Sequence, residues 1–308
     1  MNPSPGHRLG RIAALACAAV VSPLVGAQHP VYRSATTLVS VSVSVKHGNA
    51  TVANLSTKDF VLTDNGVPQA VEAVSIESVP IDVTLFLDTS GSTAGTLDDM
   101  REDVQAIARM LQSGDRFRLL TIGDSVYATV PWVSAGTTVE VTLRPVAGIS
   151  LVNDALMFGL LHRAGPGRRH LVVGMTDRKD CGSVVPAGLL HELAGRSDAV
   201  MHLVGYSGSA ATAAERIRSC TPIARHDGES LIVQAAERTG GELHKRLHLF
   251  RPWSIARVFQ SILGDFRQSY VLRYAPSGVP SRGWHAIVVQ VPGVRNATIR
   301  ARQGYYGG

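Results

Sequence analysis

The first part of the chain has the hydrophobic pattern of β-strands. From Leu38 to Val45 the sequence reads LVSVSVSV, so apolar and polar residues alternate with period two. This alternation is typical of a strand with one buried face. Two short apolar runs then flank the sequence DNG at residues 64–66, which favours a tight hairpin turn. We therefore expect residues 31–79 to form a small β module.

The pattern changes at Ile81. The segment IDVTLFLD, which ends at Asp88, is a nearly continuous apolar run, as expected for a parallel strand that is buried on both faces. Over residues 96–112, apolar positions recur at spacings of three and four, which predicts an amphipathic helix. Gly114 is its expected end.

The same alternation of strand and helix patterns continues along the chain. Segments with a strand pattern are DRFRLLTIG, RRHLVVGMTD and DAVMHLVGYS, and segments with a helical pattern are NDALMFGLLHRA, PAGLLHELAGR and SLIVQAAERTGG. Strands that alternate with helices of this length are typical of a parallel sheet with helices on both faces. The predicted fold class is α/β, a doubly wound and mostly parallel sheet.

A further amphipathic helix is expected after Pro252, roughly to Gln268, and the strand-like segments SYVLRYAP, GWHAIVVQVP and ATIRARQGYY follow it. The predicted organisation is an N-terminal β module at residues 28–80, an α/β domain at 81–250, and a helix plus β extension at 251–308. These two β segments flank the α/β domain in the sequence.

Residues 1–27 have the pattern of a secretory signal peptide: two arginines precede an apolar run over residues 12–25, and small residues precede Gln28. The run is shorter than the ~20 residues of a membrane-spanning helix and contains Pro23. No later segment is long and apolar enough to span a bilayer. The predicted location is therefore secreted, periplasmic or in the cell envelope.

The composition of the chain, with 308 residues of which 45% are hydrophobic and 18% charged, is that of a folded protein with a substantial core. Removal of residues 1–27 takes two arginines and no acidic residue, so the formal charge falls from +6 to +4. The remaining basic residues are scattered in pairs without an aromatic platform, which argues against a nucleic-acid partner.

Two cysteines, Cys181 and Cys220, follow the predicted signal peptide. Disulfides persist outside the cytoplasm, so this pair is the candidate for one disulfide bond. The two cysteines do not have the spacing of metal ligands.

Polar side chains follow two of the predicted buried strands. Asp88 ends the first strand and Asp177 ends the run HLVVGMTD, and the carboxyl ends of parallel strands form the edge of the sheet where ligands bind. Ser90 and Ser92 follow the first aspartate, and Ser150 precedes a predicted helix. Two carboxylates and three hydroxyls from three loops are hard oxygen ligands that suit Mg²⁺ or Mn²⁺.

The sequence DTSGS at residues 88–92 resembles the Asp-x-Ser-x-Ser motif of von Willebrand factor type A (VWA) domains, and in particular a secreted bacterial group with a β segment on each side. The resemblance covers about residues 31–307 and includes LSTKDFVLTDNGVPQAV, QAAERTGG and FRQSYVLRYAP. It implies a metal-ion-dependent adhesion site (MIDAS). The ligands that it implies are Asp88, Ser90, Ser92, Ser150 and Asp177.

Two loops depart from the pattern of this family. Where the family usually has GGTALYDAL, the chain has GISLVNDAL, with Ile149 in place of a glycine and Ser150 in place of a threonine. Where the family has TDG, the chain has TDRKD, so Arg178 replaces a glycine. This cation would either weaken metal binding by repulsion or pair with Asp177 when no metal is bound, and Asp180 would offset its charge.

The resemblance implies a binding protein without catalysis, in which the metal ion captures an acidic side chain of a partner protein. The alternative is a metal-free VWA scaffold that acts through its β segments in an envelope complex. A third interpretation takes the hydroxyls only as helix caps, which does not explain why an aspartate ends each of two buried strands.

Enzyme classes fit the sequence less well. An aspartic protease needs a second copy of its aspartate motif, a serine hydrolase needs Gly-x-Ser-x-Gly, and an aspartyl phosphotransferase needs a carboxylate where Ser90 stands. His244 and His248 have a spacing worth testing for zinc, but without a helical Glu-x-x-His context we interpret them as surface or packing residues.

Overall fold

The computed structural model describes residues 38–90, 97–144, 150–205, 227–245 and 254–308. Thr37–Gly308 form one compact unit. The predicted signal peptide, residues 1–27, lies outside the described residues. No helix in the described part of the chain is long and apolar enough to cross a membrane.

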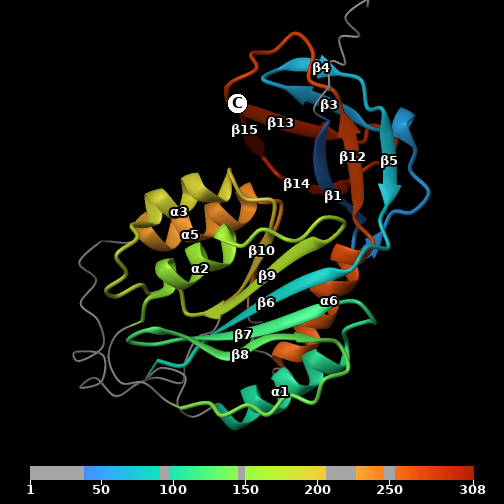
Figure 1. The fold of residues 1–308 in the computed structure, drawn as a ribbon. Helices are drawn as coiled ribbons and strands as arrows, with labels where there is room; N and C mark the ends of the chain where they lie inside the picture. Colours follow the sequence, from blue (N-terminus) through green and yellow to red (C-terminus); the bar gives the residue numbers. More distant parts are fainter. Residues whose placement is uncertain (1–37, 91–96, 145–149, 206–226, 246–253) are drawn as a thin grey trace, which may run out of the picture. The chain divides into compact units, whose positions relative to one another are not determined.

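A mostly parallel sheet forms the centre of the α/β domain (Figure 1), and its strand order in the described residues is β11-β10-β9-β6-β7-β8. The strands are β6 (Ile81–Asp88), β7 (Arg116–Ile122), β8 (Val126–Ser134), β9 (Arg169–Thr176), β10 (Val200–Gly205) and β11 (Leu243–His244). All neighbouring pairs are parallel except β7 and β8. The predicted fold class is therefore confirmed, whereas the antiparallel edge strand β8 was not predicted.

Helices cover both faces of this sheet (Figure 1). They are α1 (Leu97–Arg109), α2 (Val152–Leu161), α3 (Ala187–Ala194), α5 (Asp227–Arg238) and α6 (Ile255–Arg267). Helices α1 and α6 share an apolar cluster with one face, and α2, α3 and α5 share another cluster with the opposite face. Strand β6 is buried along its whole length, with Leu85 in the first cluster and Phe86 in the second, as the continuous apolar run predicts.

The strands outside the α/β domain form two antiparallel sheets, of order β14-β1-β12-β5 and β15-β13-β3-β4, with β2 beside β1. The elements are β1 (Val39–His47), β2 (Ala50–Thr51), the 3₁₀ helix η1 (Thr57–Asp59), β3 (Val61–Asp64), β4 (Val67–Gln69), β5 (Ala73–Ile76), β12 (Tyr270–Tyr274), β13 (Gly283–Gln290), β14 (Ala297–Ala301) and β15 (Gly304–Gly307). Strand β1 pairs with β12 and β14, and β3 pairs with β13. The β segments before and after the α/β domain thus contribute to the same two sheets, which share one apolar cluster.

Candidate metal centre

The candidate centre lies where the strand order of the α/β sheet reverses. Strand β6 has β7 on one side and β9 on the other. In open α/β sheets, ligands bind beyond the carboxyl ends of the strands at such a reversal. Asp88 is the last residue of β6, and Asp177 follows Thr176, the last residue of β9. Both predicted carboxylates are therefore at this edge.

Asp88 is only 1% exposed, and its carboxylate accepts hydrogen bonds from neutral groups. Its Oδ2 accepts hydrogen bonds from the hydroxyls of Ser150 (3.2 Å) and Thr176 (2.9 Å), and its Oδ1 accepts one from the backbone N–H of Ser90 (3.0 Å). Within the described part of the chain, no lysine, arginine or histidine pairs with Asp88. A buried carboxylate is thus held in place by three donors that carry no charge.

Ser150 is buried and its side chain faces Asp88 rather than the helix that follows. Helix α2 has Leu151 at its N-cap, without a capping side chain. The carboxylate of Asp154 accepts hydrogen bonds from the backbone N–H groups of Val184 (3.1 Å) and Val185 (2.8 Å). The helix-cap interpretation therefore does not apply to Ser150.

The loop after β9 is tied to the loop that carries Ser150. The backbone N–H of Cys181 donates to the carbonyl oxygen of Ser150 at 2.8 Å. Asp180 accepts hydrogen bonds from the backbone N–H of Asn153 (3.0 Å) and from the hydroxyl of Ser183 (2.5 Å). These contacts hold the loop that carries Ser150 and the loop after β9 in a fixed position relative to each other, so the sheet edge is preorganised.

Asp177 lies beside these groups, and its side chain is 13% exposed. Its Oδ1 accepts a hydrogen bond from the backbone N–H of Lys179 (3.0 Å), and its Oδ2 is 3.7 Å from the ammonium nitrogen of Lys179. The Lys179 side chain is 63% exposed, so this ion pair is mostly in solvent and weak. A metal ion at this edge would compete with the ammonium group of Lys179 for the carboxylate of Asp177.

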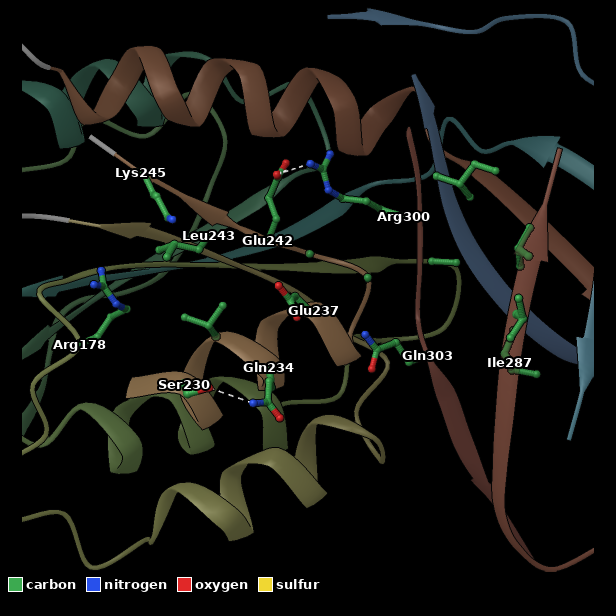
Figure 2. Close-up of a pocket in the computed structure, with 17 residues that line it drawn as sticks. Arg178, Ser230, Gln234, Glu237, Glu242, Leu243, Lys245, Ile287, Arg300 and Gln303 are labelled. Carbon is green, nitrogen blue, oxygen red and sulfur yellow. Dashed lines mark hydrogen bonds and ion pairs between the residues drawn. The ribbon is translucent and has the colours of Figure 1, made fainter. Parts of the chain in front are cut away.

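Arg178 has a backbone φ of 65°, in the left-handed region that favours glycine. This conformation explains why a glycine suits the position that Arg178 occupies. The hydroxyl of Thr176 accepts a hydrogen bond from the backbone N–H of Arg178 at 2.9 Å. Figure 2 shows the Arg178 side chain at one end of a pocket of about 1030 Å³, whose other walls come from α5, β11, β13 and β14.

Ser92, Ile149 and Cys220, which the sequence predictions named, lie outside the described residues. Cys181 is disulfide-bonded in the structure, and its pairing with Cys220 stays a prediction. The residue that the sequence analysis missed is Thr176, which it treated only as part of the strand. A hydroxyl at the end of a buried strand, next to Asp177, was the signal available.

The donor set suits a hard divalent cation. Carboxylate and hydroxyl oxygens are the ligands that Mg²⁺ prefers, and a serine hydroxyl that donates its hydrogen to Asp88 keeps lone pairs on its oxygen. Of the predicted ligands in the described residues, Ser150 contacts Asp88 through its hydroxyl and Ser90 through its backbone N–H. Asp177 is one residue from Thr176, which contacts Asp88.

Neither a protein-family model nor a curated protein sequence matches this chain. Similar solved structures include a von Willebrand factor type A protein from Catenulispora acidiphila (TM-score 0.47, 11% identity, 87% of this chain and 73% of that one). Others are the ArnB paralog VWA2 from Sulfolobus acidocaldarius (TM-score 0.43, 10% identity, 67% and 51%) and proximal thread matrix protein 1 from the mussel byssus with a zinc-occupied MIDAS motif (TM-score 0.42, 14% identity, 65% and 48%). The chain spans about half the length of these last two.

Two of these similar structures are named as VWA proteins, and the α/β domain of this chain is a mostly parallel sheet with helices on both faces. Five of its strands are parallel in the described residues, with the antiparallel strand β8 at one edge. The two antiparallel sheets are additional to this domain.

Proposed function

We propose that this chain is a non-enzymatic binding protein, exported through residues 1–27, in which a divalent cation at the sheet edge captures an acidic side chain of a partner protein. Mg²⁺ or Mn²⁺ is the proposed ion. Its proposed ligands are Asp88, Ser90, Ser92, Ser150 and Asp177.

The observation that carries this proposal is the burial of Asp88 without a cationic partner among the described residues. An ionised carboxylate that is removed from water is costly unless it is paired or coordinates a metal. Hydrogen bonds from Ser150 and Thr176 offset part of this cost, but they are neutral, and no cationic side chain among the described residues pairs with Asp88. A divalent cation at this edge would supply a counter-charge.

The ligand set also fits capture of a partner. When bound, the metal would supply a directional attraction to a carboxylate oxygen. Asp88 and Asp177 would together balance the charge of the ion, while the serine hydroxyls add oxygen ligands without adding charge. Mg²⁺ and Mn²⁺ sites commonly retain water ligands, which an incoming carboxylate can replace. Binding in this way breaks no covalent bond in the partner.

The first test is thermal unfolding with Mg²⁺ or Mn²⁺ against a chelator. An ion that binds only the folded state raises stability by about 2.7 kcal/mol at 100 times its Kd, which corresponds to an increase in Tm of roughly 5–10 °C for a domain of this size. We expect this increase in the wild type and its loss in Asp88→Asn. Asp98→Asn is the matched control, because it makes the same change at an exposed side chain of α1. It should respond as the wild type does.

A second test addresses the partner. Immobilised wild-type chain should retain a protein from an envelope extract in Mg²⁺ and release it on chelation, whereas immobilised Asp88→Asn should retain none. If the wild type binds the same protein in both buffers and Mg²⁺ leaves Tm unchanged, the metal-free scaffold is correct instead. The ion pair between Lys179 and Asp177 is the observation that favours this alternative.

A further inference from the structure

A second group of metal-binding side chains lies on β10 and β11, apart from the sheet edge. The Nδ1 atom of His202 is 3.0 Å from Nε2 of His244, and Oε1 of Glu242 is 3.7 Å from the same Nε2. One ligand atom from each of these three residues lies within 4.8 Å of the others. The sequence spacing indicated His244 together with His248, which lies outside the described residues. His202 was not predicted because it is inside an apolar run.

The fold places this group in a partly enclosed position. His202 is 8% exposed, and the side chains of His244 and Glu242 are 21% and 24% exposed. A small cavity of about 30 Å³ is lined by His202 and Glu242 and also by residues of β1, α6 and β14. A space of this size is sufficient for one or two water molecules, so it can hold a water ligand beside the histidine.

Glu242 is oriented by a charged neighbour. Its Oε2 forms an ion pair with Arg300 of β14, while its Oε1 is the oxygen on the side of His244 (Figure 2 shows the Arg300 pair). A ligand carboxylate whose other oxygen is held by a neighbouring donor is the usual arrangement around protein-bound metals. Arg300 would therefore act as a positioning residue for Glu242.

The two histidine rings can both offer a nitrogen lone pair to one ion. Only one of two facing ring nitrogens can carry a proton in this contact, and a neutral imidazole can move that proton to its other nitrogen. Both facing nitrogens can then offer a lone pair to one ion.

The distance between the two histidine nitrogens matches a tetrahedral ion, and Oε1 of Glu242, at 3.7 Å from Nε2 of His244, would move closer on binding. Two nitrogens that each lie about 2.0 Å from Zn²⁺ are roughly 3.3 Å apart in tetrahedral geometry, close to the 3.0 Å between His202 and His244. Two imidazoles and one carboxylate, with a fourth position for water, are a ligand set that proteins use for Zn²⁺. Hard cations such as Mg²⁺ avoid imidazole nitrogen, so this group selects a different ion from the sheet edge.

We propose that His202, Glu242 and His244 form a binding site for Zn²⁺, with a fourth position filled by water. The site bridges β10 to the two-residue edge strand β11, so the ion would hold β11 in place. It shares no residue with the sheet-edge centre and is independent of the function proposed for that centre.

The test is zinc binding by the tag-free chain, measured by competition with a chromophoric chelator, with Co²⁺ absorption as a spectroscopic probe. We expect one tightly bound Zn²⁺ and a tetrahedral Co²⁺ spectrum that Mg²⁺ does not displace. His244→Gln should weaken binding at least about 100-fold, the upper end of the loss caused by mutating groups around a zinc ligand. Glu242→Gln should also weaken binding and is a second variant should His244→Gln fold poorly.

Two control variants separate this site from others. His47→Gln changes an exposed histidine at the end of β1 and should bind zinc as the wild type does. Asp88→Asn should also keep this zinc, which distinguishes the site from the sheet edge. The proposal would be overturned if zinc binding survived in both His244→Gln and Glu242→Gln, or if it were lost in Asp88→Asn. A wild-type chain that binds no zinc would also overturn it.

Discussion

Replacing Asp82 by alanine is expected to lower the free energy of unfolding by about 3 kcal/mol. Asp82 is in β6 and its side chain is fully buried. It accepts hydrogen bonds from Nε of Arg116 (2.9 Å), from the terminal nitrogen of Arg116 (2.5 Å) and from Nε of Arg168 (2.6 Å). Burial raises the pKa of its carboxyl group, but the hydrogen bonds from the two arginines outweigh burial and leave the pKa below its usual range.

The size of this effect follows from what the substitution leaves behind. Removing one partner of a buried ion pair costs about 3–5 kcal/mol because the other charge stays in the protein without compensation. The side chains of Arg116 and Arg168 are 39% and 18% exposed, so both can partly reach water. We therefore expect the lower end of the range.

Asp198→Ala is the matched control, because Asp198 also pairs with an arginine, Arg302, at 3.2 Å, but its side chain is 93% exposed. Arg302 is itself only 13% exposed, but it keeps hydrogen bonds to the backbone carbonyl oxygens of Gly304, Gly195 and Ser197 when Asp198 is replaced. Loss of the solvent-exposed carboxylate is therefore expected to cost about 0–1 kcal/mol. Urea unfolding of the two variants and the wild type, with unchanged m-values, would measure the difference. Equal losses in the two variants would show that burial of Asp82 does not set its contribution.

The hydrophobic pattern predicted most strands and helices of the α/β domain because a buried parallel strand is a continuous apolar run. Strand β8 was missed because it is an edge strand: its sequence VYATVPWVS contains Pro131 and several exposed positions, so it has neither a continuous run nor a clean alternation. Within sheets, proline is confined to edge strands, to the first residue of a strand and to bulges.

The pairing of the outer strands could not be predicted in the same way. Alternation in LVSVSVSV shows that β1 has one buried face, but it does not show which strand lies beside it. The actual partners include Tyr270–Tyr274, more than 200 residues away in the sequence. Contacts between residues so far apart in the sequence depend on the tertiary fold, and the hydrophobic periodicity of one segment does not show which distant segment will pair with it.

The two candidate metal centres also differ in how far the sequence could predict them. Asp88 and Asp177 end strands whose carboxyl ends must share one edge, so their proximity follows from topology. His202 is in the middle of an apolar strand, whereas Glu242 and His244 come after the end of α5, in a segment without a continuous apolar run. Their proximity depends on the register of β10 against β11, in which Leu203 faces Leu243, and that register is visible only in the structure.

Substitution of Gly241 by alanine is expected to lower the free energy of unfolding by more than about 4 kcal/mol, which is at the extreme of single substitutions. A Cβ atom at Gly241 would lie 1.8 Å from the carbonyl oxygen and 2.6 Å from the carbonyl carbon of Met201. Both are backbone atoms of β10, so no side-chain rotation can relieve the clash. The adjacent residue anchors the same strand, since the backbone N–H of Leu203 donates to the carbonyl oxygen of Glu242 at 2.9 Å.

Gly264→Ala is the control for this prediction, because it makes the same chemical change where no atom lies within 4 Å of the added Cβ. Gly264 is in the interior of α6, where alanine favours the helix by about 0.5–1 kcal/mol relative to glycine. Urea unfolding should therefore show opposite signs for the two variants. A Gly241→Ala chain as stable as the wild type would mean that β10 and the segment leading into β11 do not approach each other this closely, and the zinc site that depends on this approach would then lose its geometric basis.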